Sequence, residues 1–410
     1  MRKLKIAAAA LAAGLAPAVP AAAEVEFMSW TVTEETGKPV IEAMAEAFDG
    51  TVVQQGYAWG EMNKNYVLRA RSGTLPDVGQ TQNRLLPTVA AATDPLDLNE
   101  VIGRDRLLEM FDESTLKAGE VDGRQVALPW LAGTIGWVAN QEVLDAAGVD
   151  GLPTTIEEFR ADLEAVRDAV PNAVPFAMAT KNPASILLDY LILAWTFGAE
   201  PIGEDGTPAV NSPEAVAALE FMAGLMEDRL AAPEIDRPDA RRLFAQGASA
   251  FYIDAPQALS FARQFSGRDA EIDAAVVPMA GPVLDEGDTP VSISWGHVLA
   301  VFGEENADPD GEAIRWVMHL LSDEQLVPYA VGQAVLPGTR SGQASAEVQD
   351  NAYLADWAAA SVSPRRNTVA SLDNATDVAA IIGEEVQAAL LGQKTAQQAA
   401  DDMQSRLEGL

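Results

Sequence analysis

The chain has 410 residues, and its 61 acidic side chains outnumber 27 basic ones, which leaves a formal net charge of -34. An acidic surface of this strength argues against a nucleic-acid partner, which needs a basic patch, and against electrostatic docking on anionic lipid. The chain contains no Cys, so disulfides and a lipid-modified cysteine anchor are excluded. The length exceeds the roughly 100–200 residues of one domain, so two lobes are expected.

The first 23 residues have the pattern of a secretory signal peptide. Met1 to Lys5 is basic, Ile6 to Ala16 is apolar and uncharged, and Ala21 to Ala23 supplies the small residues that precede a cleavage site. A membrane anchor is the alternative, but the uncharged stretch is at the short limit for a span of roughly 20 residues, and two prolines interrupt it. We therefore expect a cleaved signal peptide and an unanchored protein in the periplasm of a double-membrane bacterium.

Short runs of β-forming residues then alternate with segments whose apolar residues have helical spacing. Strands are expected at 25–30, 51–53 and from 76 onward, and helices around 41–48 and 62–70, each closed by a glycine. This alternation is typical of an α/β fold with a mostly parallel sheet that has helices on both faces.

Helix starts are also readable further along the chain. Thr154 and Glu157 are spaced as a capping box, which predicts a helix from about 154. Ser212 followed by Pro213 is an N-cap with proline at the first helical position, and Asp308 before a proline repeats the pattern.

Several short motifs are spread along nearly the whole mature chain. They are Gly73–Val78, Asp122–Trp130, Asn140–Leu144, Phe244–Phe251, Val276–Pro282 and Trp295–His297. The order of these motifs resembles that of the extracellular solute-binding proteins of family 1, the group that is similar to maltose-binding protein. No single segment is specific, but their order is.

The resemblance implies a two-lobed periplasmic-binding-protein fold of type II, in which hinge crossings join two α/β lobes. On this basis the first lobe is expected at 24–130 and 283–337, the second at 131–277 and 342–410, and the hinges near 128–133, 276–282 and 336–341. It also implies a monomeric receptor without a cofactor, which captures a carbohydrate between its lobes and delivers it to the inner-membrane permease subunits of an ABC importer.

A carbohydrate site needs aromatic rings for the C–H faces of the sugar and polar groups for its hydroxyls. In open α/β sheets such groups lie beyond the carboxyl ends of strands or at the crossings. The candidates selected in this way are Trp30, Thr31, Tyr57, Trp59, Thr81, Gln82, Asn83, Gly133, Asn182, Ser185, Asp254, Trp295, Gly296, His297 and Arg340. Maltose-binding protein carries an aromatic and an acid where this chain has the polar residues 80–83, which argues against a maltodextrin ligand.

Each candidate also has a purely structural explanation. Trp295, next to a glycine, is the strongest candidate for stacking, whereas Trp59 is as well suited to packing a loop. Asp254 is also a suitable helix N-cap. Arg340 and the pair Arg365–Arg366 would bind an anionic sugar in bidentate fashion, although solvated arginine is the default interpretation.

Enzymatic functions find little support in the same residues. There is no cysteine nucleophile, no nucleophile elbow and no phosphate loop, and the histidines are His297 and His319 alone. A periplasmic glycoside hydrolase with two carboxylates stays open as an alternative, because the sequence cannot show which acids share a cleft. A receptor for polyamines or osmolytes is the alternative within the binding class. No catalytic residue and no metal ligand is expected.

Overall fold

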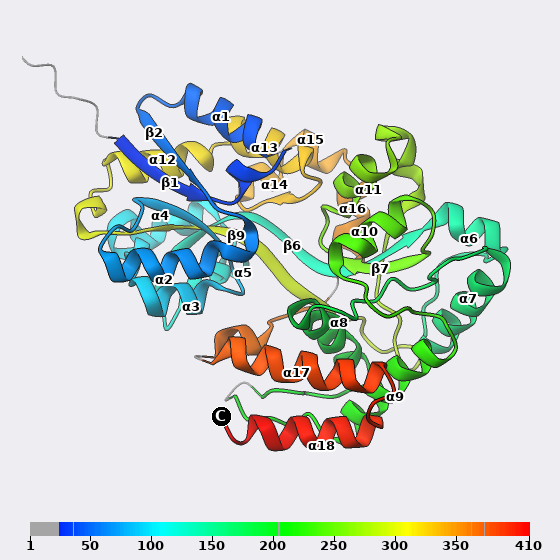
Figure 1. The fold of residues 1–410 in the computed structure, drawn as a ribbon. Helices are drawn as coiled ribbons and strands as arrows, with labels where there is room; N and C mark the ends of the chain where they lie inside the picture. Colours follow the sequence, from blue (N-terminus) through cyan, green and yellow to red (C-terminus); the bar gives the residue numbers. More distant parts are fainter. Residues whose placement is uncertain (1–23, 36, 204–205, 362, 373) are drawn as a thin grey trace, which may run out of the picture.

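The structure is a computed structural model that describes residues 24–410 except 36, 204–205, 362 and 373. The predicted signal peptide, residues 1–23, lies outside the described residues. Figure 1 shows two α/β lobes with the long strands β6 (Ala127–Asn140) and β9 (Ser292–Val301) running between them. We call the lobe around β1 the first lobe and the lobe around β7 the second lobe.

The first lobe contains β1 (Glu24–Ser29), β2 (Thr51–Gly56) and β3 (Val78–Gln82), which pair in parallel in the order β3-β1-β2. Beyond β3 the sheet continues through β9, β6 and the short β10 (Leu336–Pro337), all antiparallel to their neighbours. The α/β fold is therefore as expected, but its sheet is mixed. Parallel neighbours need a crossover connection such as a helix between them, which β1, β2 and β3 have. β6 leaves the first lobe and β9 returns to it, so these two strands run in opposite directions and pair antiparallel.

Helices cover this sheet on both sides. They are α1 (Lys38–Ala47), α2 (Met62–Ser72), α3 (Leu86–Thr93), α4 (Arg104–Met110), α5 (Glu113–Leu116), α12 (Glu312–Leu320), α13 (Asp323–Gly332), α14 (Arg340–Gln343) and α15 (Ala346–Gln349). A two-stranded ladder of β4 (Glu120–Val121) and β5 (Arg124–Gln125) lies beside them. As predicted, Gly73 ends α2 in the left-handed conformation with a φ of 65°.

The second lobe is built on the distal half of β6, with which β7 (Phe251–Asp254) and β8 (Val276–Met279) pair antiparallel. The short β11 (Pro364–Arg365) pairs with the start of β9. The helices of this lobe are α6 (Gln141–Ala147), α7 (Ile156–Ala169), α8 (Pro183–Thr196), α9 (Pro213–Glu227), α10 (Arg237–Ala245), α11 (Ala258–Ser266), α16 (Ala352–Ala360), α17 (Ala375–Leu390) and α18 (Ala396–Leu407).

Buried aromatic side chains anchor both lobes to the crossing strand β6. In the first lobe, Trp130 lies edge-on to Phe27 with ring centroids 6.4 Å apart. In the second lobe, Trp137 stacks on Phe176 with ring centroids 5.2 Å apart. Both tryptophans are almost completely buried. Since they lie on the same strand, β6 forms part of the core of both lobes.

The three helix N-caps predicted at residues 154, 212 and 308 have different outcomes in the structure. The capping box is formed by Thr155 and Glu158, one residue later than predicted, because Thr155 has the extended backbone that an N-cap requires. Asp308 does not cap a helix. Its carboxylate accepts from the amide of Asp310 in a turn, and α12 begins only at Glu312. By contrast, Ser212 caps α9 with Pro213 at its first position, as predicted.

The segments expected as crossings lie at different points of this architecture. The segment 276–282 begins in β8, which pairs with β6 inside the second lobe, and Val283 forms a bridge to Thr155 there. The segment 336–341 enters α14, which packs against α4 of the first lobe, whereas α16 packs against β8 of the second. We propose that β6 and β9 are the first two crossings, and that the third lies between α15 and α16. Within the described residues, no helix has the length and apolarity needed to cross a membrane.

Candidate functional site

A buried polar cluster lies in the first-lobe sheet where it meets the crossing strand β9. The strand register aligns Gln80 of β3 with Leu299 of β9, so His297, two residues along, is its diagonal neighbour on the same face. The Gln80 amide Nε2 lies 3.1 Å from His297 Nδ1, and its Oε1 accepts from Thr31 Oγ1 at 3.0 Å and from Ser29 Oγ. This network orients the residues that follow β1.

The network also determines the protonation of His297. Because the Gln80 nitrogen can only donate, His297 Nδ1 accepts, and the proton of the neutral ring is on Nε2. Burial lowers the pKa of His297 to about 3, so the imidazole is neutral at physiological pH. Neutral imidazole serves here as a fixed hydrogen-bonding and packing group.

Aromatic rings surround His297. Trp30 lies edge-on to the imidazole at a centroid distance of 4.7 Å, and Trp295 lies at the same distance of 4.7 Å on β9. Trp30 and Trp295 are only 3% and 6% exposed, so little of either indole is available to a ligand in this conformation. Trp295 instead packs at the junction of the lobes, where a Cβ added to Gly133 would lie 3.3 Å from its ring and 3.0 Å from Pro256. Glycine at 133 permits this close approach of β6, β9 and the second lobe.

An exposed aromatic lies at the edge of the first lobe. Trp59, in the loop after β2, is 45% exposed. The guanidinium carbon of Arg84 lies 5.5 Å from the centroid of its ring. Arg84 follows β3, and its Nε donates to Gln82 Oε1 at 2.7 Å. A partly exposed indole with fixed polar neighbours is a suitable surface for a sugar ring.

The facing part of the second lobe is held by two ion pairs. Arg241 of α10 binds both carboxylate oxygens of Asp254 at 2.6 and 2.9 Å, and its guanidinium carbon lies 3.7 Å from the centroid of the Phe261 ring. Arg237, also on α10, donates to the fully buried Asp189 at 2.5 Å. Asp254 therefore anchors Arg241. It is not a helix N-cap, because its carboxylate accepts from the adjacent amide of Ala255 and α11 begins only at Ala258.

Charged groups of the two lobes approach one another across the junction. Enclosure by protein atoms raises the pKa of Glu34 from 4.5 to about 7, and attraction from Arg241 of the other lobe partly opposes this. Enclosure also lowers the pKa of Arg84 to about 10, and repulsion from Arg237 of the other lobe adds to this decrease. Glu34 is nevertheless exposed and Arg84 half-buried. Glu34 and Arg84 of the first lobe therefore lie where charged groups of the second lobe come close, and each side chain is still partly open to solvent.

Comparison with known proteins identifies the family. The family model of bacterial extracellular solute-binding proteins matches residues 40–356, which is more than half of the chain. The chain belongs to this family. This solute-binding protein is 24% identical over 366 residues to a Brucella abortus protein described as a putative binding protein, and the match covers 86% of each chain.

A further relative and a solved structure have more specific descriptions. The diacetylchitobiose binding protein DasA of Streptomyces coelicolor is 24% identical over 275 residues, which are 66% of this chain and 61% of that protein. The GacH receptor of Streptomyces glaucescens, solved unliganded and with acarbose, superimposes with a TM-score of 0.80 at 18% identity over 94% of this chain and 97% of that one. The second likeness shows the fold alone, and it confirms the predicted two-lobed architecture.

The other first-lobe residues predicted for the site lie in or beside the crossing sheet. Thr81 and Gln82 are buried within β3. Asn83 Nδ2 contacts Ser294 Oγ of β9 at 3.4 Å. Gly296 lies inside β9, opposite Ala132 of β6. These residues therefore help to join β3, β9 and β6, and Gln82 in addition orients Arg84.

In the second lobe and at the surface, the predicted residues have structural partners. Asn182 caps α8, and Ser185 Oγ donates to Asp236 at 3.1 Å. Tyr57 lies beside Arg69 of α2. Arg340 pairs with Asp112 at 2.6 Å on the first lobe, apart from the charged groups that face one another across the junction.

Sequence reasoning missed four charged residues that approach one another across the junction of the lobes: Glu34, Arg84, Arg237 and Arg241. Arg84 directly follows the polar run that was selected, so its position after β3 was an available signal. The other three carried no local signal, because their meeting depends on how the two lobes face one another.

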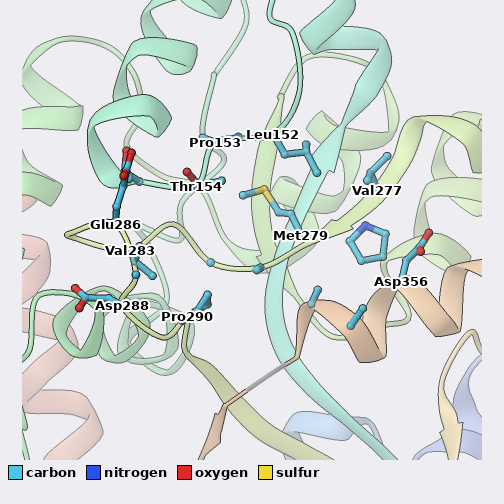
Figure 2. A pocket seen from close by; sticks show the side chains of 17 residues that line it. Leu152, Pro153, Thr154, Val277, Met279, Val283, Glu286, Asp288, Pro290 and Asp356 are labelled. Carbon is cyan, nitrogen blue, oxygen red and sulfur yellow. The ribbon is translucent and has the colours of Figure 1, made fainter.

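The structure also contains a pocket of about 660 Å³ in the second lobe. Figure 2 shows it beside Met279 and Val277 of β8, with Thr154 on one side and Asp356 of α16 on the other. None of the residues predicted for the site lines it. Its acidic residues Glu286, Asp288 and Asp356 are all exposed, so we do not assign it to the binding of the solute.

The pKa of Glu34 leads to a prediction for stability. Because the folded state holds the proton of Glu34 more tightly than the unfolded chain, this contribution to stability is present below about pH 4.5 and is lost as the pH rises through 7. Glu34→Gln is therefore expected to raise the Tm relative to wild type at about pH 8 but not at about pH 4, which lies below the pKa of the unfolded chain. Thermal unfolding at both values checks this, with the exposed neighbour Glu35→Gln as control. Equal Tm differences at the two pH values would contradict it.

Proposed function

We propose that this protein is the periplasmic receptor of an ABC importer, and that it captures a carbohydrate between its lobes and delivers it to inner-membrane permease subunits. Family membership supports a role in solute capture. The names of the relatives support the solute class, since one binds diacetylchitobiose and another was solved with acarbose. The N-terminal pattern supports export to the periplasm.

The observation that carries the proposal is the pairing of an exposed indole with fixed polar groups at the junction. Trp59 offers a partly exposed indole, Arg84 beside it supplies a guanidinium, and Gln82 holds that guanidinium in place. From the second lobe, Arg237 lies close enough to Arg84 to repel it, and Arg241 lies close enough to Glu34 to attract it. A sugar that contacts both lobes favours the closed state by its higher affinity for that state. The protein is proposed to act as a monomer and to return its ligand unchanged.

Thermal unfolding against a panel of neutral and acidic sugars, polyols and polyamines tests this proposal, with analysis of each compound afterwards. A sugar that raises the Tm and is recovered intact supports a carbohydrate receptor, because a ligand of the native state stabilises it by mass action. Hydrolysis of the sugar would instead identify a glycosidase. An increase in Tm with polyamines alone would show that the ligand is a cation and that the protein is not a carbohydrate receptor.

A further inference from the structure

Arg84 differs from the other arginines at the junction. Arg237 and Arg241 each bind a carboxylate of their own lobe, Asp189 and Asp254 respectively. Among the described residues, no carboxylate oxygen lies within the 4.0 Å ion-pair distance of Arg84. Its side chain contacts the neutral amide of Gln82 and the ring of Trp59. The chain has a net charge of -34, so an enclosed cation without an acid is not explained by a shortage of acids.

The surroundings of Arg84 add to its positive potential. Arg237 of the second lobe is close enough to repel it, and enclosure lowers its pKa to about 10. Both oxygens of Asp254 are already bound by Arg241. Since Arg237 already binds Asp189, Arg84 is the cation that lacks an anion, and enclosing an unpaired cation beside another cation costs free energy.

The hydrogen bond to Gln82 fixes the orientation of the guanidinium. Nε of Arg84 donates to Gln82 Oε1 at 2.7 Å. The terminal nitrogens Nη1 and Nη2 donate no hydrogen bond to any group in the part of the chain that the structure describes. Two adjacent N–H donors match the two oxygens of a carboxylate or sulfate. The ring of Trp59 lies next to this group and can carry the body of a sugar.

We propose that the carbohydrate bound by this protein carries an acidic group, and that Arg84 binds that group through its terminal nitrogens. This inference rests on the proposed function and names its substrate class: acidic sugars, with a carboxylate or sulfate beside the ring that stacks on Trp59.

Matched pairs of sugars test the inference by calorimetry: glucuronate against glucose, galacturonate against galactose, and glucose 6-sulfate against glucose. The acidic sugar of each pair is expected to bind at least about tenfold more tightly than the neutral one. Its affinity is expected to fall as the NaCl concentration is raised. If glucose 6-sulfate binds more tightly than the uronates, the acidic group is a sulfate. If the uronates bind more tightly, it is a carboxylate.

Arg84→Gln is expected to bring the affinity ratio of each pair close to one without lowering the Tm, because Arg84 has no ion pair to lose among the described residues. Arg84→Lys keeps the charge and is expected to retain part of the preference. The control is Arg71→Gln, which removes an exposed cation from α2 of the same lobe. Equal or tighter binding of the neutral sugars by wild type would overturn the inference and leave the proposed function standing. Failure of every sugar to bind would overturn both.

Discussion

Trp59→Ala is expected to weaken carbohydrate binding about tenfold or more while the Tm of the unliganded protein stays nearly unchanged. The indole is 45% exposed, so its removal deletes a stacking surface and little packing. The affinity would be measured by calorimetry with a sugar that raises the Tm of wild type.

Two variants make this result specific to the site. Leu68→Ala removes another exposed apolar side chain, 49% exposed on α2, and is expected to leave affinity unchanged. Trp295→Ala deletes a side chain that is 6% exposed and is expected to lower the stability as well, by about 3–5 kcal/mol. An unchanged affinity in Trp59→Ala would remove Trp59 from the site.

Asp189→Ala is expected to destabilise the second lobe by about 3–5 kcal/mol, because it leaves the buried cation of Arg237 without its partner. Asp189 is completely buried on α8 and accepts from Arg237 at 2.5 Å and from the amide of Ala179 at 2.8 Å. The loss corresponds to a decrease in Tm of roughly 6–20 °C. Thermal or denaturant unfolding measures it.

The matched control is Glu142→Ala, which breaks the exposed ion pair with Arg268 and is expected to cost about 1 kcal/mol or less. Replacing both members of the buried pair, as Asp189→Leu with Arg237→Met, is expected to recover much of the lost stability, because no unpaired charge is left. Equal destabilisation by Asp189→Ala and Glu142→Ala would contradict the assigned role of the buried pair.

Local signals predicted many elements of this fold. Gly73 ends α2 and Ser212 caps α9 as expected, because caps and periodicity depend on residues within a few positions. The predicted helix start was wrong by one residue where two neighbouring residues could both act as the N-cap, as with Thr154 and Thr155.

The sequence by itself therefore determined the fold class, the family and the starts of some elements, since these follow from local propensity and from the order of motifs. Only the tertiary structure decided that β6 and β9 pair between the lobes, that Trp59 is exposed while Trp295 is buried, and that Arg84 faces Arg237. Burial and charge pairing depend on residues far apart along the chain, and no local pattern records which distant side chains will meet.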